Sequence, residues 1–307
     1  MINFRYHVVS IIGIFIALAV GVVLGAGPLQ RSINAGMNPS SSQAASDPVL
    51  SAQAEAEAAG LKALASSTLS GSLTGTSVAL VVLPGASDDD VSAIRSTLTD
   101  AGASVVGRVT LTDNWQSTSM SQYRTTLATT LASHLQSGAA KTASADGVVG
   151  YSIVQVLTST GAETDLLRQI LTDKSTPLMT IDEDPAGKAT TLVAVGARAQ
   201  STTSTQASVA ASSDAWIGLG LAVGSTSGVV VGDASSREAM ISQIRTSGTA
   251  VTTVDSVGTT LASVDTALAL STASSGARAF GVGNGAQSVI PSSKYARVDA
   301  MCLVGPR

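Results

Sequence analysis

The sequence is poor in the residue types on which catalysis, metal binding and nucleic-acid binding usually depend. Its 307 residues include one cysteine, Cys302, and two histidines, while only 3% are aromatic and 12% are charged. A single cysteine excludes an intramolecular disulfide, so export is permitted but not indicated. With so few aromatic residues, the protein has no surface on which the bases of a single-stranded nucleic acid could stack. Its net charge of −4 also gives no indication of a basic surface that would bind the phosphates of a nucleic acid. The composition therefore argues against a nucleic-acid partner.

Motifs for an enzyme or a cofactor are also missing. The chain has no G-x-S-x-G elbow and no P-loop, and His134 falls within a helical pattern without evident catalytic partners. The "GVGNGA" segment (281–286) imitates a dinucleotide-binding loop, but Pro291 follows where a long helix should begin, which favours a tight turn. We therefore expect a non-enzymatic protein without a cofactor.

Metal ligands are scattered along the chain. The acidic groups Asp88–Asp90 and Asp182–Asp184 are more typical of a first helical turn and of a loop than of a cation site. Copper prefers thiolate, thioether and imidazole ligands, yet Cys302, His134 and the six methionines form no M-x-x-M, C-x-x-C or H-x-H motif. The sequence predicts no metal site.

One long apolar segment lies near the amino terminus. Between Val8 and Ala26 the only polar side chain is Ser10, and these residues as a helix span roughly 28 Å, close to a bilayer's hydrocarbon thickness. A secretory signal is usually shorter and ends in a small-x-small cleavage site. Cleavage after Ala26 would place the bulky Leu24 at a position that requires a small residue, and cleavage after Gly27 would be hindered by Pro28. The segment over residues 8–27 is therefore predicted to be a retained transmembrane helix.

Small residues recur every four positions along this helix, at Gly13, Ala17, Gly21 and Gly25. Such a stripe allows two helix backbones to approach closely within a membrane, although glycine and alanine are also common there without that role. We interpret the stripe as a helix-packing interface. The short stub over residues 1–7 favours a cytoplasmic amino terminus, a single span in the cell membrane and an extracytoplasmic carboxy-terminal domain.

Motifs at both ends of the chain resemble a known family. The opening "RYHVVS" (5–10) and "GVVLGAGPL" (21–29), together with "VDSV" (254–257), "ALAL" (267–270) and "GVGNGA", are similar to the actinobacterial copper-transporter B family, the mycobacterial MctB and corynebacterial SteB type. The resemblance implies two functions. One is scaffolding with a SteA-like membrane partner to regulate cell-wall hydrolysis at cell division; the other is copper efflux through a channel-forming envelope protein.

A tether over residues 28–47 is followed by a predicted helical stalk over residues 48–70. Leu50, Ala54, Leu61 and Leu64 fall at d, a, a and d positions of a heptad, but Glu57 occupies the intervening d position and Gly60 weakens the middle. The resemblance implies a coiled coil here. We expect a homodimer, held by this short stalk together with the transmembrane stripe.

Alternating strand and helix patterns fill residues 76–290. The apolar run "TSVALVVLP" (76–84), the helix from Asp88 to Asp100 and the strand "ASVVGRVTL" (103–111) predict a right-handed parallel crossover. Further helices are expected over 120–136, 148–171, 214–225, 236–245 and 259–271, with strands between them. The pattern predicts an α/β fold, a doubly wound, mostly parallel Rossmann-like domain, followed by a tail over 291–307.

The residues favour the scaffolding function over the channel. A conducting pathway needs several spanning helices or a closed barrel, and the strands here show continuous apolar runs rather than the alternation of a porin. We therefore expect a bitopic envelope protein that assembles with a SteA-like partner, with copper efflux as the alternative.

Overall fold

The computed structural model describes residues 48–199, 210–272 and 276–291. The chain divides into two compact units, Met1–Ala56 and Glu57–Arg307, with the boundary inside helix α3 (Pro48–Leu69). The predicted transmembrane helix and tether lie outside the described residues, as does the tail beyond Pro291. Within the part of the chain that is described, no helix is both long and apolar enough to cross a bilayer.

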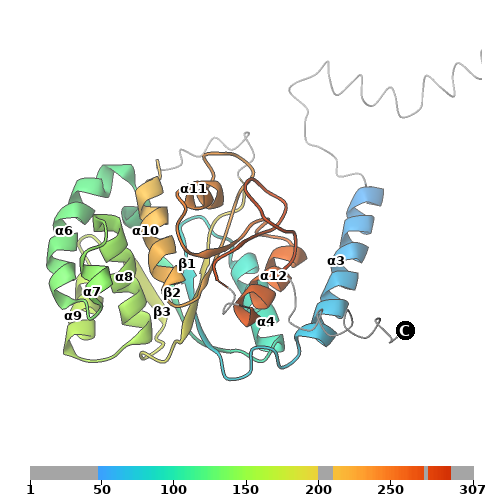
Figure 1. The fold of residues 1–307 in the computed structure, drawn as a ribbon, viewed down its shortest axis with the longest axis horizontal. Helices are drawn as coiled ribbons and strands as arrows, with labels where there is room; N and C mark the ends of the chain where they lie inside the picture. Colours follow the sequence, from blue (N-terminus) through green and yellow to red (C-terminus); the bar gives the residue numbers. More distant parts are fainter. Residues whose placement is uncertain (1–47, 200–209, 273–275, 292–307) are drawn as a thin grey trace, which may run out of the picture. The chain divides into compact units, whose positions relative to one another are not determined.

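A seven-stranded sheet forms the centre of the second unit (Figure 1). Its strand order is β3-β2-β1-β4-β5-β6-β7, and all neighbours are parallel except β3, which pairs antiparallel with β2 at one edge. The strands are β1 (Ser77–Val82), β2 (Ser104–Leu111), β3 (Met179–Glu183), β4 (Thr191–Val195), β5 (Val229–Val231), β6 (Thr252–Val254) and β7 (Ala279–Phe280). The predicted α/β class with a mostly parallel sheet is confirmed.

From Val78 to Val82, strand β1 is buried on both faces, because it has no polar side chain there to turn outward. Ala79 and Val81 contribute to the apolar core on one face of the sheet, while Val78, Leu80 and Val82 contribute to the core on the other. Successive side chains of a strand point to opposite faces, so a continuous apolar run requires a helical layer on each side.

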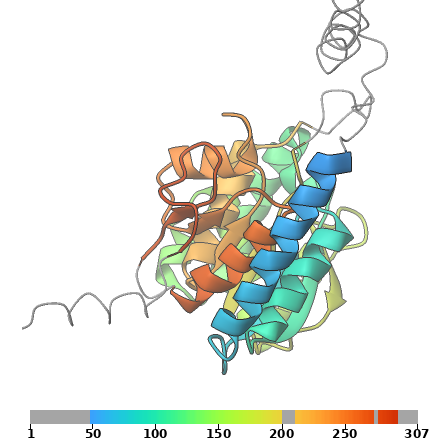
Figure 2. The ribbon, with the colours of Figure 1, turned by 90° about the vertical axis from the view of Figure 1, so that its right-hand side faces the viewer.

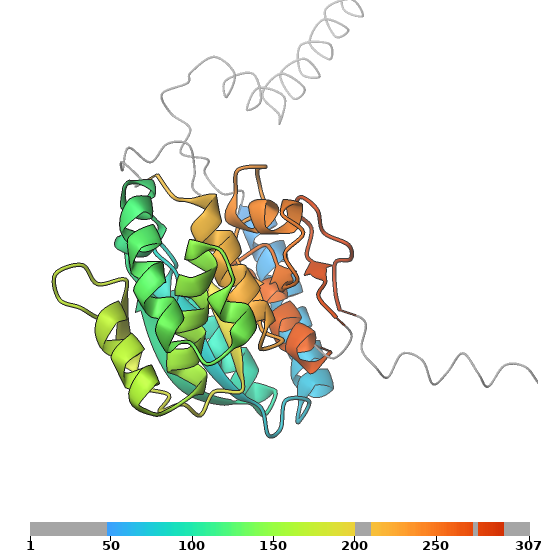
Figure 3. The ribbon, with the colours of Figure 1, turned by 60° about the vertical axis from the view of Figure 1, so that its left-hand side comes forward.

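Two helical layers meet this requirement. Helices α4 (Asp88–Asp100) and α12 (Thr260–Ser271) cover one face, joined by residues 57–69 of α3 (Figure 2). The other face carries a thicker layer that includes α6, α8, α9 and α10 (Figure 3). Its helices are α5 (Asp113–Gln116), α6 (Ser121–His134), α7 (Gly138–Lys141), α8 (Ala145–Thr158), α9 (Ala162–Leu171), α10 (Ser213–Gly224) and α11 (Met240–Thr246), with the 3₁₀ turn η1 (Thr118–Met120) before α6.

The sequence predictions match the elements closely, with two corrections. The β1–α4–β2 crossover is confirmed as parallel. The segment 148–171, expected as helix throughout, belongs to two helices: α8 ends at Thr158, where Ser159 is extended, and Gly161 at φ +116° precedes the start of α9. The helix expected from residue 236 begins only at Met240, and the four residues before it form bends.

Helix α10 is apolar and glycine-rich because it packs against α8 at very short range. A Cβ at Gly218 would lie 2.4 Å from the carbonyl carbon of Asp146, and one at Gly150 would lie 2.6 Å from the carbonyl oxygen of Gly218. Backbone therefore meets backbone at this crossing, and only glycine fits. Reciprocal close packing explains why a helix of membrane-like composition belongs to the core of this domain.

We predict that Gly218→Ala destabilises the protein by about 2 kcal/mol, because the added methyl group must push two helix backbones apart. The matched control is Gly60→Ala in α3, where a Cβ meets nothing within 4 Å; it should leave stability unchanged or raise it by up to about 1 kcal/mol. Urea unfolding followed by circular dichroism measures both. Equal stability of the two variants would contradict the assigned α8–α10 contact.

Candidate functional site

The strand order of the sheet indicates one position at which a ligand site is expected. The chain runs from β1 outward to β2, and later resumes at β4 on the other side of β1. Ligands in open α/β sheets bind outside the carboxyl ends of the strands at such a reversal. Arg198 follows β4 at this position, and Asp90 lies in the first turn of α4, which follows β1.

Arg198 and Asp90 form a bidentate ion pair across the reversal. The Nε and Nη2 atoms of Arg198 donate to the two carboxylate oxygens of Asp90 at 2.7 and 2.6 Å. Asp90 is almost fully buried, whereas the side chain of Arg198 is half exposed. Hydrogen bonding to Asp90 raises the pKa of the Arg198 guanidinium. The pair ties the segment after β4 to the start of α4.

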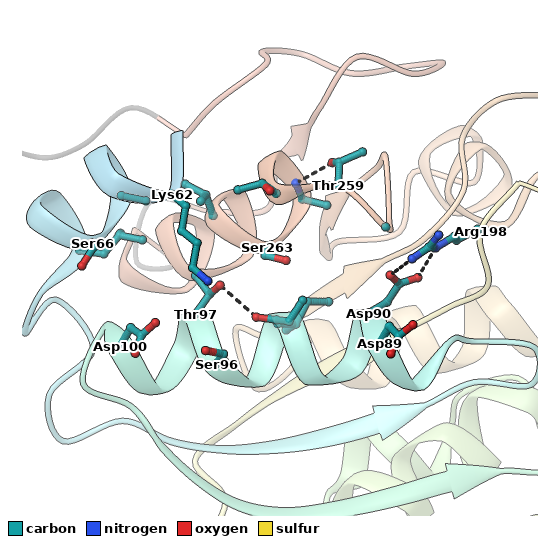
Figure 4. A pocket seen from close by; sticks show the side chains of 18 residues that line it. Lys62, Ser66, Asp89, Asp90, Ser96, Thr97, Asp100, Arg198, Thr259 and Ser263 are labelled. Atoms are coloured by element: carbon teal, nitrogen blue, oxygen red, sulfur yellow. Dashed lines mark hydrogen bonds and ion pairs between the residues drawn. The ribbon is translucent and has the colours of Figure 1, made fainter. Parts of the chain in front are cut away.

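A groove of about 340 Å³ extends from this ion pair between α3, α4 and α12 (Figure 4). Ile94, Leu69 and Ala262 give it an apolar floor. It is also lined by hydroxyl and charged groups from all three helices and their ends, namely Lys62, Ser66, Asp89, Ser96, Thr97, Asp100, Thr259 and Ser263. Its volume falls in the range of small-molecule binding sites, and we take this groove as the candidate functional site.

The groove was not predicted from the sequence, although α4 carries a pattern that points to it. Asp89, Ala93, Ser96, Thr97 and Asp100 recur at helical spacing, beside the buried stripe formed by Val91, Ile94 and Leu98. Such a polar stripe on a covered helix is ordinarily a solvated face. Only the position of α3 and α12 opposite this stripe turns it into the wall of a groove.

Arginines form ion pairs with most carboxylates of the two acidic clusters, Asp88–Asp90 and Asp182–Asp184. Asp88 pairs with Arg108 at 2.6 Å, and in β3 and the loop after it Glu183 pairs with Arg95 and Asp184 with Arg168, each at 2.5 Å. These bonds hold the pKa values of Glu183 and Asp184 below their ordinary values. Both clusters therefore fasten the sheet edge and the start of α4.

The glycine-rich loop after β7 is held by Asp255 and Arg245. The amides of Val282 and Gly283 donate to the two carboxylate oxygens of Asp255, each at 2.9 Å, and Arg245 donates to Asp255 and to the carbonyl of Asn284. Desolvation acts to raise the pKa of Asp255, but these hydrogen bonds and one from Ser256 hold it below its ordinary value. The amides that would cradle a phosphate are already used, in agreement with the predicted tight turn.

Gly281 shows how closely this carboxylate fits. Its φ is +121°, and a Cβ there would lie 2.1 Å from Oδ1 of Asp255. The "VDSV" and "GVGNGA" segments, 24 residues apart in the sequence, are thus one hydrogen-bonded unit.

Asp265 on α12 is a buried carboxyl group without a partner. Its side chain is fully buried, and neither carboxylate oxygen has a hydrogen-bond partner among the described residues. Burial, aided by the nearby charge of Asp255, raises the pKa of Asp265 to about 7.

The structure places only part of the predicted interface. Gly13, Ala17, Gly21 and Gly25 lie outside the described residues. Leu50, Ala54 and Leu64 are exposed on α3, the two leucines at 64% and 66%.

Leu61 takes a different position from the other heptad residues. It packs with Ala65 and Leu69 against the core of its own domain, a stripe at four-residue spacing that the heptad assignment did not include.

The candidate soft metal ligands are not brought together in the described part of the chain. His134, at the end of α6, contacts Glu163 through Nδ1 at 2.5 Å, and Met179 and Met240 are buried in the core. No group of three or more histidine, cysteine or acidic residues suited to a metal ion occurs there. Cys302 lies outside it.

Comparison with known proteins gives one match. The sequence model of a protein family described as "Copper transport outer membrane protein, MctB" matches residues 1–291. A search of the curated proteins found no match.

We predict that Asp265 makes stability fall as pH rises from about 4 to about 7. The folded state keeps the proton in this window while the unfolded chain, with the ordinary pKa of 3.8, loses it; the loss is therefore about 1.4 kcal/mol per pH unit and ends above pH 7. Asp265→Asn should remove this dependence and exceed the native protein in stability at pH 8. Thermal unfolding from pH 4 to 8 tests this, with the exposed Asp165→Asn as control; identical profiles for all three proteins would refute the prediction.

Proposed function

The chain belongs to the MctB family of copper transport outer membrane proteins, and from this membership and the geometry of α3 we propose that it is a non-enzymatic envelope scaffold. In this proposal it assembles with a SteA-like membrane partner, and with itself, to hold or regulate cell-wall hydrolysis at cell division. The family description supports an envelope protein linked to copper transport. The choice of partner rests on the resemblance of the terminal motifs.

The exposure of Leu64 is the observation that carries the proposal. One stripe of α3, formed by Leu61, Ala65 and Leu69, is anchored on the domain, and Leu64 lies off this stripe with two thirds of its surface in solvent. An anchored helix presents such a side chain at little entropic cost, which suits recognition of a second helix. Leu50 occupies the same heptad position two heptads earlier and is similarly exposed.

The predicted transmembrane helix would complete the assembly surface. Gly13, Ala17, Gly21 and Gly25 would allow a partner helix to approach within the bilayer, where burial of apolar surface gives no drive for association. The stalk and the span would then contact the partner on both sides of the membrane surface.

We predict that Leu64→Glu lowers the yield of self-association and of partner capture by about tenfold, because it places a charge in an apolar helix seam. Ala63→Glu is the matched control, since Ala63 is also exposed on α3 but occupies a c position. Chemical crosslinking in membranes, pulldown of the full-length protein and mass spectrometry measure both. Equal capture by the native protein and Leu64→Glu would reject α3 as the interface.

Copper efflux is the second candidate, favoured by the description of the family. It requires soft ligands that converge in the complete protein, and outside the described residues His7, Cys302 and three methionines (Met1, Met37 and Met301) are available. Titration of the full-length protein in detergent with Cu(I) distinguishes the two functions. The scaffold proposal predicts no stoichiometric binding, whereas tight binding that is lost in Cys302→Ser would favour copper transport.

A further inference from the structure

The groove between α3, α4 and α12 has features of a ligand site that the scaffold proposal does not use. We propose that it binds a short basic peptide in an extended conformation, and that the bound peptide fastens α3 to the domain. The proposal does not depend on the scaffold function, because the groove is lined by other residues than Leu50 and Leu64.

Three serines provide unoccupied hydroxyl groups, one from each helix. Ser66 on α3, Ser96 on α4 and Ser263 on α12 all line the groove, and no side-chain hydrogen bond joins them to any described residue. Ser263 is 94% buried, with a relative exposure of only 6%. Its Oγ is not one of the fully buried side-chain atoms that lack a partner, so this hydroxyl opens into the groove, where a ligand or water can bind it. Peptide N–H and C=O groups are suitable partners for these three hydroxyls.

The charges of the groove favour a cationic ligand. It is lined by two cations, Lys62 and Arg198, and three carboxylates, Asp89, Asp90 and Asp100. Asp90 is neutralised by Arg198, whereas Asp89 and Asp100 have no ion pair among the described residues. A ligand with two ammonium groups would pair with Asp89 and Asp100, and its terminal carboxylate would pair with Lys62.

The length of the groove matches a short peptide. Asp89 and Asp100 mark its two ends on α4 (Figure 4), and eleven residues of helix correspond to roughly 16 Å. An extended peptide of about four or five residues covers this distance.

The apolar residues that line the groove further restrict the chemistry of the ligand. Ala65, Ala93 and Ala262 leave room for small side chains, and no described residue that lines the groove is aromatic. Flat rings and sugar faces therefore have no aromatic surface on which to stack. A peptide of small residues with one basic side chain fits these conditions.

Occupation of the groove would strengthen the hold of the domain on α3. Lys62 extends from α3 toward Thr97 of α4 across the groove, and Ser66 lies one turn further along α3 (Figure 4). A ligand in contact with these side chains and with Ser96 adds bonds across a junction otherwise made by Leu61, Ala65 and Leu69. Opening of this part of α3 should then become rarer, because a ligand stabilises the state that binds it.

The experiment is calorimetric titration of the full-length protein in detergent with the tetrapeptide AAKA and its acidic counterpart AAEA. AAKA should bind about tenfold more tightly than AAEA, and Asp89→Asn and Asp100→Asn should each weaken AAKA by about fivefold. Asp165→Asn, an exposed carboxylate on α9, should leave its affinity unchanged. Binding should weaken as salt increases.

A second pair of variants separates loss of the groove from loss of the fold. Ala93→Phe should fill the groove and abolish binding, whereas Ser92→Phe, at the adjacent exposed position that does not line it, should bind as the native protein does. Hydrogen exchange should show slower exchange of amides 61–69 when AAKA is present. Absence of binding at millimolar AAKA, equal affinity for AAEA, or binding by Ala93→Phe would overturn the proposal.

Discussion

Burial of the central strands on both faces is the constraint on which the architecture depends. β1 and β4 consist almost entirely of valine, leucine and alanine, and all their residues except Ser77 are buried. Each face must therefore be covered by helices, and the chain must leave and return over the sheet to provide them. The reversal of strand order between β1 and β4 follows from covering both faces in this way, and it places the Asp90–Arg198 pair at the carboxyl edge.

The helices that cover the two faces of the sheet pack in different ways. On the face that carries α8 and α10, glycines allow helices to pack with backbones in contact, so little space is left between them. On the opposite face α4 and α12 pack together, but α3 is anchored by a single stripe of small and medium-sized side chains. Close packing on one side and a looser third helix on the other explain why the groove occurs where it does.

Helix α3 takes part in both proposals made above. α3 belongs to the stalk in the scaffold proposal and also forms one wall of the groove. A ligand that bridges α3 and α4 would change how firmly the stalk is held, and binding energy in the groove could thereby influence association of the stalk with another chain. Away from the groove, the Arg95–Glu183, Arg168–Asp184 and Arg245–Asp255 ion pairs hold loops and the sheet edge to the domain.

The sequence by itself determined the fold class, the family and most of the elements. Continuous runs such as "VALVV" specify strands buried on both faces, and the acidic start of α4 specifies a helix, because each signal is local in the chain. The heptad spacing of α3, by contrast, did not distinguish Leu61, which packs on the domain, from Leu50 and Leu64, which are exposed. Strand order and the pairing of Asp255 with the loop after β7 were decided only by the tertiary structure, since they depend on contacts between distant segments. The groove belongs to this second group: serines on three separate helices line a common groove only when packing brings those helices together.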